Sequence, residues 1–443
     1  MEKKNTWETY SSKQLKELEK INAQYRDFLD NGKTERECID TIVNTIEKSG
    51  YRELESLIKE GTALKTGDKV YSVWMNKSIA MFQIGRKPMT EGMNILGAHI
   101  DSPRLDVKQN PLYEDGGFAY LDTHYYGGVK KYQWVTIPLA IHGVIVKKDG
   151  TCVEINIGEN EDDPVFFVSD LLIHLAQEQL EKKAAKVIEG EALDIIVGNK
   201  PLLIDKKDKK KDEKEAGKEA VKAGVLDILK ETYDIHEEDF VSAELEIVPA
   251  GKAREAGFDR SMILAYGQDD RVCAYTSMQA MLDSDVTDRT MCCILVDKEE
   301  IGSVGATGMQ SHFFENAVAE VMNLTGEYSE LHVRRCLAHS CMLSSDVSSA
   351  FDPTYASSFD KKNVAYLGGG MVINKFTGAR GKSGSNDANA EYLAHLRHIF
   401  DKAEVNFQTA ELGKVDLGGG GTIAYILALY GMNVIDSGVA VLN

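Results

Sequence analysis

From residue 270 to the end, the sequence alternates between helix-like and strand-like segments. Helical spacing of apolar residues covers 272–282, 311–326 and 386–400, and short apolar runs cover 290–297 and 432–443. Strands that alternate with helices pack into an open sheet with helices on both faces. The pattern therefore predicts an α/β fold, a mixed sheet between helices, for the C-terminal half. The strand-like segments at 67–85 and 93–101 join the first 108 residues to it.

The middle of the chain follows a different pattern. Residues 139–158 read as a β-hairpin with its turn at 148–150, and residues 168–188 read as a helix capped by Ser169. Residues 205–220 hold seven lysines and six acids, which is typical of a solvated loop or a frayed helix start. We predict that 109–249 is a β-rich domain inserted into a discontinuous domain formed by 1–108 and 250–443.

Composition excludes several classes of function. The formal net charge of −19 argues against general binding to nucleic acid or to an anionic membrane. No apolar run approaches the roughly eighteen residues that span a bilayer, and the charged N-terminal stretch does not resemble a secretory signal. The seven cysteines include no CxxC pair. We expect a cytoplasmic protein in a reducing environment.

Polar side chains gather where the expected strands end. The sites are His99 with Asp101, Asp269 with Asp270, Glu299 with Glu300, Asp346, and Asp436. In open α/β sheets, ligands bind at the carboxyl ends of the strands. Each residue alone is more often structural: a lone histidine is commonly a hydrogen-bonded core residue, and two adjacent aspartates commonly cap a helix. Together they place one histidine and several carboxylates at one edge, where cations must neutralise them.

This ligand set favours a divalent metal. Imidazole and carboxylate suit zinc, and also manganese or cobalt. Two neighbouring ions need a carboxylate that bridges them, and a further carboxylate can take a proton from a metal-bound water. Because adjacent side chains in an extended turn point in different directions, one of Glu299 and Glu300 can bind metal while the other faces the water.

Five motifs resemble, in order, those of the M18 metallo-aminopeptidases, the aspartyl-aminopeptidase family. They are "GAHIDSPRLDVK", "DDRVCAY", "DKEEIGSVGATG", "SSDVSSAFDP" and "GGGGTIAYI". The segment "HYYGGVKKYQW" at 124–134 is most similar to the bacterial branch. The resemblance implies a peptidase that removes N-terminal residues from short peptides with two metal ions, zinc foremost. It also implies that the inserted domain serves dimerisation or acts as a lid.

The resemblance implies roles for individual residues. His99, Asp269 and Asp346 match the ligands of one metal, with Asp269 bridging. Glu300 matches a ligand of the second metal, Glu299 the general base, and Asp101 the carboxylate that orients His99. The second metal's histidine, which the family has after the last strand, has no counterpart in "SGVAVLN". Two alternatives stay open: a longer chain supplies this histidine beyond Asn443, or the second metal lacks that ligand.

Four further residues are candidates for contact with the substrate. Asp270 is a candidate partner for the substrate's α-amino group. Lys375 is a candidate for a substrate carboxylate, with a surface lysine as the alternative, and His339 is a candidate pocket residue. His174 matches a family histidine that reaches an active site, that of a neighbouring subunit included; the alternative is a buried helix residue between leucines.

The resemblance also implies assembly into a tetrahedral dodecamer that admits only short peptides. The family's name suggests a preference for acidic N-terminal residues, and neutral residues remain an equal alternative. Two other functions stay open. One is a related dizinc carboxypeptidase or deacylase, and the other is an assembly protein with an incomplete metal site.

Overall fold

A computed structural model describes residues 5–202 and 219–442, and these fall into two compact units. Unit one runs up to Ser102 and resumes at Gly267, and unit two is Pro103–Tyr266. Unit two thus begins earlier and ends later than the predicted 109–249. The reason is that a long strand starting at Arg104 already pairs within the sheet of unit two. Most of the charged segment 205–220 lies outside the described residues.

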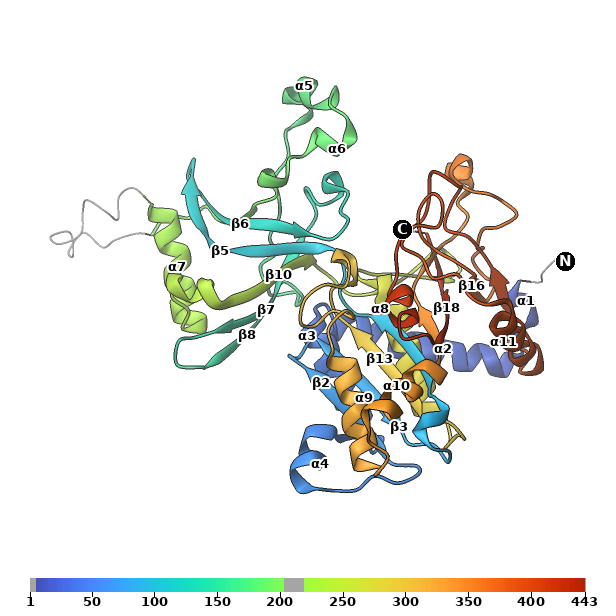
Figure 1. Cartoon of the computed structure of the whole chain (residues 1–443). Helices are drawn as coiled ribbons and strands as arrows, with labels where there is room; N and C mark the ends of the chain where they lie inside the picture. Colours follow the sequence, from blue (N-terminus) through green and yellow to red (C-terminus); the bar gives the residue numbers. More distant parts are fainter. Residues whose placement is uncertain (1–4, 203–218, 443) are drawn as a thin grey trace. The chain divides into compact units, whose positions relative to one another are not determined.

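Unit one contains a nine-stranded mixed sheet (Figure 1). In spatial order its strands are β1 (Arg52–Glu53), β2 (Lys69–Trp74), β3 (Ser78–Gln83), β13 (Met291–Val296), β4 (Asn94–His99), β14 (Cys341–Ser345), β18 (Asn433–Gly438), β16 (Met371–Asn374) and β17 (Phe407–Thr409). The four central strands β13, β4, β14 and β18 run parallel, so their carboxyl ends lie at one edge. β13 and β3 are buried along their whole length, as expected for central strands.

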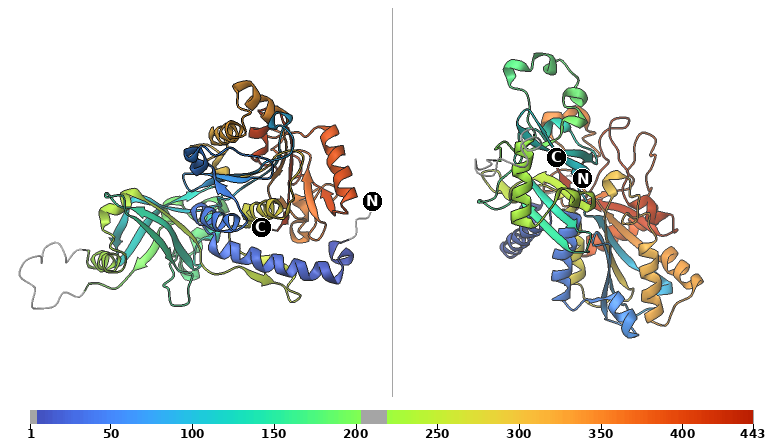
Figure 2. Two further views of the ribbon diagram at one scale, coloured as in Figure 1. Left: turned by 90° about the horizontal axis from the view of Figure 1, so that it is seen from below. Right: turned by 90° about the vertical axis from the view of Figure 1, so that its left-hand side faces the viewer.

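Helices cover both faces of this sheet, which confirms the predicted α/β class. The helices of unit one are α1 (Thr6–Thr9), α2 (Ser12–Asn31), α3 (Glu35–Glu47), α4 (Leu54–Glu60), α8 (Gln268–Asp283), α9 (Phe313–Leu324), α10 (Glu330–His339), α11 (Ala390–Lys402) and α12 (Ala424–Ala428). Apolar residues of α4, α9, α10 and α12 share one core with the strands. On the other face, α8 packs on β4 and β13, and the long blue helix α2 packs against α8 (Figure 2).

Local sequence signals explain where the N-terminal helices begin. The Ser11 side chain and Gln14 form a capping box at the start of α2, and Thr34 and Glu37 form another at α3. Rings from α2 and α8 then meet, with Phe28 and Tyr275 5.5 Å apart between centroids. These contacts fix α8, whose first turn carries Asp269.

Unit two is built on a six-stranded antiparallel sheet with helix α7 beside it. Its strands are, in spatial order, β8 (Cys152–Ile157), β7 (Leu139–Val146), β10 (Ala243–Pro249), β5 (Arg104–Asp115), β6 (Phe118–Tyr126) and β9 (Ile195–Gly198), and α7 is Ala220–Tyr233. Smaller elements are α5 (Gln177–Leu180), α6 (Ala184–Val187), β11 (Arg254–Ala256) and β12 (Met262–Leu264) in unit two, and β15 (Ser348–Ser349) and β19 (Ala440–Val441) in unit one. The hairpin predicted at 139–158 is β7 and β8.

The single helix predicted over 168–188 is wrong. This segment forms a 3-10 turn, Ile173–Leu175, followed by the short helices α5 and α6. Leu172 and Leu175 are 71% and 70% exposed, so they do not form the buried apolar face of a helix in unit two. Their apolar spacing predicted a helix, but no surface within the unit covers that face.

Among residues 5–202 and 219–442, no helix combines the length and the apolar character needed to cross a bilayer.

Candidate metal centre

The predicted site residues of unit one meet at the carboxyl edge of its parallel strands. His99 is the last residue of β4, Asp346 follows β14, and Asp436 lies in β18. Glu299 and Glu300 lie in a 3-10 turn, Glu299–Ile301, that follows β13. Because these strands are parallel neighbours, residues from four distant parts of the sequence meet at one edge.

Three of the predicted ligands form a cluster of metal-binding geometry. His99, Asp269 and Asp346 each offer a ligand atom, and these atoms all lie within 4.8 Å of one another. His99 Nε2 is 3.2 Å from Asp269 Oδ1. One imidazole nitrogen and two carboxylates are a donor set that suits zinc, so the residues present fit a divalent ion.

Asp101 connects the histidine to the glutamate turn. It is fully buried, and its backbone carbonyl oxygen and its Oδ1 lie 3.0 Å and 3.2 Å from His99 Nδ1. Oδ1 also accepts the Glu299 backbone N–H at 3.1 Å, and Oδ2 accepts the Glu300 backbone N–H at 3.1 Å. Asp101 therefore orients the His99 ring through its backbone and its side chain, and the same side chain holds the turn that presents both glutamates.

The electrostatics of the cluster favour a cation. Burial raises the pKa of Glu300 to about 8, against His99, which lowers it, while Asp269 and Asp101 add to the rise. Burial, and then the Asp270 carboxylate, raise the pKa of Asp346 above its usual range. Burial lowers the pKa of His99, but hydrogen bonds to Asp101 and Asp269 raise it well above its usual value. Carboxylates crowded in this way are stabilised in their charged form by a positive ion.

Beside the cluster lies a pocket of about 340 Å³. Its lining includes Asp269, Glu299, Glu300, Asp346 and Asp436, together with Asn374, Thr377, Ser349 and Thr422. Gly420 and Gly421 of the "GGGGTIAYI" motif also line it. Its apolar lining residues are Val347, Leu412, Val441 and Leu442. The described lining residues include no lysine or arginine, so the pocket has acidic and apolar surfaces.

Glycine is required where β18 passes the site. A Cβ atom placed on Gly438 would lie 1.8 Å from the backbone oxygen of Asp346. The close approach of these two backbones sets the position of Asp346 next to β18.

Three other candidates of unit one take different positions. Asp270 is fully buried and does not line the pocket, so its side chain is not exposed there to a substrate amine. Lys375 is exposed and also absent from the lining, although its neighbour Asn374 lines the pocket. His339 ends α10, its Nδ1 is 2.8 Å from the Thr90 carbonyl oxygen, and it precedes the start of β14. The structure therefore brings neither Lys375 nor His339 to the pocket.

His174 belongs to unit two and is exposed in the turn Ile173–Leu175. The alternative of a buried helix histidine is wrong. Of the histidines in unit one, only His99 belongs to the described three-residue cluster.

The sequence indicated no role for Asp436 and no hydrogen-bond partner for its carboxylate. Thr422 Oγ1 donates to Asp436 Oδ1 at 2.5 Å, and burial raises the pKa of Asp436 to about 7. The sequence predicts Asp436 near a strand end. Its hydrogen bond, however, joins β18 to the loop that precedes α12, and the sequence does not show that these two segments meet. Asn374 and Thr377 come from a segment whose sequence carries no metal-ligand pattern, whereas Ser349 lies in the "SSDVSSAFDP" motif.

The parallel strand ends, the His-Asp-Asp cluster and the paired glutamates define a metal-dependent hydrolase of α/β architecture. Residues 28–443 match the family model described as aminopeptidase I zinc metalloprotease (M18). The chain belongs to this family of metallo-aminopeptidases. The match favours an aminopeptidase over the carboxypeptidase and deacylase alternatives.

Relatives and solved structures agree with this assignment. The chain is 63% identical over 442 residues to a probable M18 family aminopeptidase 1 of Clostridium acetobutylicum, covering 100% of this chain and 93% of the relative. A crystal structure of an M18 aminopeptidase from Thermotoga maritima superposes with a TM-score of 0.92 at 44% identity, covering 100% of this chain and 94% of that one. A crystal structure of aminopeptidase I from C. acetobutylicum gives a TM-score of 0.89 at 60% identity, with the same coverage of 100% and 94%.

Proposed function

We propose that the chain hydrolyses the N-terminal residue from short peptides at a centre of two zinc ions, with Glu299 as the general base. The observation that carries this proposal is the cluster of His99, Asp269 and Asp346 beside the glutamate turn held by Asp101. His99 and Asp346 would hold one ion, Glu300 the other, and Asp269 would bridge them. Cobalt and manganese accept the same donors and are alternatives to zinc.

The bound metal supplies two effects, polarisation of the scissile carbonyl and a lower pKa for the attacking water. Glu299 takes the proton of that water and returns it to the leaving amine. Its Oε2 lies 3.9 Å from His99 Nε2, its side chain is 15% exposed, and burial raises its pKa. A carboxyl whose pKa is raised toward neutrality is suited to both transfers.

Two isosteric substitutions separate the roles of the adjacent glutamates. We expect Glu299→Gln to lose at least about 100-fold in kcat while keeping wild-type zinc content, as for loss of a general base. We expect Glu300→Gln to lower the zinc bound per chain, measured by elemental analysis after dialysis. Glu315→Gln is the control, because Glu315 is a half-buried glutamate paired with His312, 3.2 Å away. Full activity of Glu299→Gln would refute the base assignment.

For the N-terminal residue of the substrate, we propose a neutral apolar side chain rather than an acidic one. The pocket beside the cluster offers Val347, Leu412, Val441 and Leu442 as apolar contacts. No lysine or arginine among its described lining residues is available to pair with a substrate carboxylate, and five of those residues are acidic. The substrate's positive α-amino group is attracted to the same carboxylates.

Activity toward Leu-, Ala-, Glu- and Asp-p-nitroanilide tests this preference. We expect kcat/KM for the leucine substrate to exceed that for the glutamate substrate by about tenfold or more, a difference of about 1.4 kcal/mol or more in transition-state binding. The series should be repeated with zinc, cobalt and manganese. Equal or greater kcat/KM for the glutamate substrate would restore the acidic preference.

We propose further that the chain assembles into a dodecamer. The mature Ape1 of yeast, 19% identical, has been solved as a dodecamer, and that likeness concerns the fold alone. Support from this chain is the exposed apolar segment around Leu171, Leu172, Ile173 and Leu175, with exposures of 52%, 71%, 69% and 70%. Such a patch is costly in water and is typical of a subunit interface. We propose that this segment docks on a second copy and carries His174 to that copy's site.

Native mass spectrometry and kinetics test the assembly. We expect a dodecamer at micromolar concentration, and smaller species for the double change Leu172→Asp with Leu175→Asp. His174→Ala should lower kcat/KM without changing the mass of the assembly. A wild-type monomer at that concentration would refute the proposal.

A further inference from the structure

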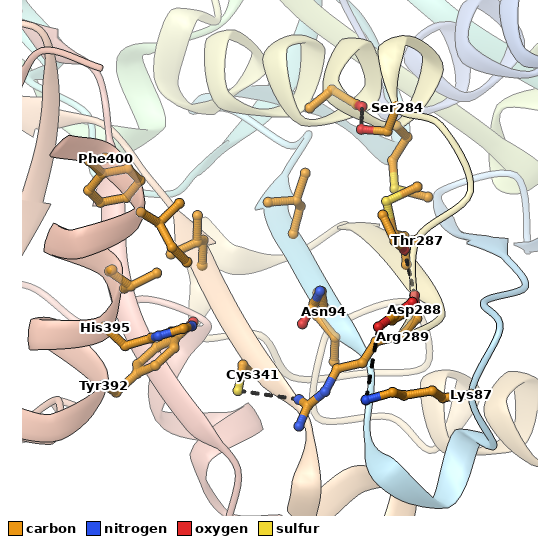
Figure 3. A pocket seen from close by; sticks show the side chains of 18 residues that line it. Lys87, Asn94, Ser284, Thr287, Asp288, Arg289, Cys341, Tyr392, His395 and Phe400 are labelled. Atoms are coloured by element: carbon orange, nitrogen blue, oxygen red, sulfur yellow. Dashed lines mark hydrogen bonds and ion pairs between the residues drawn. The ribbon is translucent and has the colours of Figure 1, made fainter. Parts of the chain in front are cut away.

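A second and larger pocket of unit one, about 610 Å³, lies at the amino-terminal ends of the parallel strands (Figure 3). It is bordered by the end of α8, the loop leading to β13, and α11, and residues of β4 and β14 line it. Asn94 begins β4 and Cys341 begins β14, so this pocket and the metal cluster lie at opposite ends of the same strands. Its volume is in the range of small-molecule sites.

The pocket contains an arginine with no acidic partner. Arg289 is half-buried, and its Nη1 donates to the His339 carbonyl oxygen at 3.2 Å and to Cys341 Sγ at 3.7 Å. Among the described residues, no carboxylate lies within ion-pair distance of its guanidinium. The nearby Asp288 faces Arg86 at 3.7 Å and Lys87 at 4.0 Å instead. A partly desolvated guanidinium of this kind favours an anion from outside the chain.

One wall of the pocket is apolar. Met281 of α8, Leu343 of β14, and Leu396, Ile399 and Phe400 of α11 line it. In Figure 3, Phe400 stands on α11 away from the end that holds Arg289 and Lys87. Leu396 and Phe400 belong to a buried cluster with partly buried Leu343 packed against it, so these walls are firmly placed. A ligand that fits must therefore be anionic at one end and apolar along its length.

We propose that this pocket binds a monocarboxylate with an unbranched aliphatic chain, its carboxylate on Arg289 and its chain against α11. The planar guanidinium matches a carboxylate with two parallel hydrogen bonds. Asn94 lines the same pocket, and its exposed amide supplies a further donor. The pocket combines two basic side chains and one acidic one in a chain of net charge −19, so its local charge differs in sign from that of the whole.

Cys341 provides a readout that is independent of activity. Among the seven cysteines, Cys152 is exposed, Cys341 is partly exposed and the other five are buried. In a Cys152→Ser background, a thiol reagent such as DTNB should therefore modify Cys341 first. Saturating octanoate should slow this reaction at least about tenfold, because the bound chain covers Cys341. Octanamide, uncharged but of the same length, should protect much less.

Affinity should depend on both ends of the ligand. Each buried methylene tightens binding about fourfold, so octanoate should bind roughly 15-fold more tightly than hexanoate by calorimetry. Arg289→Gln should weaken octanoate binding by at least about tenfold, the effect of one charge-assisted pair. The matched control is Arg334→Gln, which removes an equal charge from an exposed residue of α10 that lies 4.0 Å from Glu330 and does not line the pocket. It should bind octanoate within about twofold of the parent.

A second variant addresses the apolar wall without relying on Arg289. Ile399 is 42% exposed, so Ile399→Asp should fold and weaken octanoate more than butyrate. Three results would overturn the proposal: no protection of Cys341 by octanoate, equal protection by octanamide, or equal loss in Arg289→Gln and Arg334→Gln. The last result would mean that octanoate affinity depends on the net charge of the protein and not on contact with Arg289.

Discussion

Asp101→Asn is the substitution whose consequence follows most directly from the structure. The change keeps the size of the side chain but replaces one carboxylate oxygen by an amide NH₂. Oδ1 of Asp101 lies 3.2 Å from His99 Nδ1 and accepts the Glu299 N–H, and Oδ2 accepts the Glu300 N–H. The remaining oxygen should therefore stay at the Oδ1 position. The new NH₂ group then faces the Glu300 N–H, donor against donor.

The expected magnitude follows from these contacts. One hydrogen bond to a charged group is lost, and a buried N–H is left without an acceptor, at a cost of about 1.5–3 kcal/mol. This energy corresponds to roughly 10- to 150-fold in an equilibrium constant. Loss of a carboxylate that orients a metal-bound histidine is typically worth 10–100-fold in metal affinity, roughly the same range. Because Glu300 loosens most, the weaker-bound zinc should be the one assigned to Glu300.

Zinc titration against a competing chelator measures this affinity, and kcat at saturating zinc measures what remains of the turn's geometry. We expect weaker binding of one ion and a lower kcat, since the Glu299 N–H bond loses its charge assistance. Asp239→Asn is the matched control. Asp239 is a buried aspartate of unit two that accepts the His236 N–H at 2.8 Å. Zinc affinity and kcat within about twofold of wild type in Asp101→Asn would refute the reasoning.

Three further outcomes are expected. Gly438→Ala should lower the free energy of unfolding by about 1–3 kcal/mol and reduce the zinc content, because the added Cβ would clash with the Asp346 carbonyl oxygen. Gly381→Ala is the control: an added Cβ there has no atom within 4 Å, so neither quantity should change. Burial, and then the Glu35 carboxylate, raise the pKa of Asp297 to about 7, so its contribution to stability is present below about pH 4 and is lost as pH rises to about 7. Asp297→Asn should remove up to about 1.4 kcal/mol per pH unit from that slope in urea titrations of the metal-free chain, and an unchanged slope would contradict the assignment. Chelation should lower Tm, by an amount equivalent to about 2.7 kcal/mol when free zinc had been 100 times Kd, and an unchanged Tm would mean that the folded chain holds no metal.

The metal cluster could be predicted from sequence because its position follows from topology. Alternating strands and helices imply parallel strands, and parallel strands bring their last residues to one edge. His99, Glu299, Glu300 and Asp346 each follow an apolar run, so their strand-end position is visible in one dimension. The double role of Asp101 is not, since it depends on two backbone N–H groups about two hundred residues away, at 299 and 300.

Predictions that rested on side-chain type without topology did less well. Asp270 and Asp269 are adjacent in sequence, yet only Asp269 lines the pocket, since the turn at the start of α8 sends the two carboxylates into different surroundings. His339 lies on a helix that leads into β14, which places it at the amino end of a strand whose other end forms the site. A histidine can contribute to this site only if it lies at the carboxyl end of a strand, where the site is formed.

The pocket around Arg289 could not be predicted from the sequence. Its polar and apolar walls come from two loops, three strands and two helices, and none of the lining residues belongs to a motif quoted from the sequence. Its existence depends on how far apart α8 and α11 lie across β4 and β14, a distance set by side-chain packing on the sheet. Polar residues at the carboxyl ends of strands predict a ligand site, because open α/β sheets bind ligands there. At the amino edge, no carboxylate of the described residues pairs with the Arg289 guanidinium, and this follows from the arrangement of the helices rather than from a motif. If octanoate protects Cys341, the two edges of one sheet serve opposite charges, cations at one and an organic anion at the other.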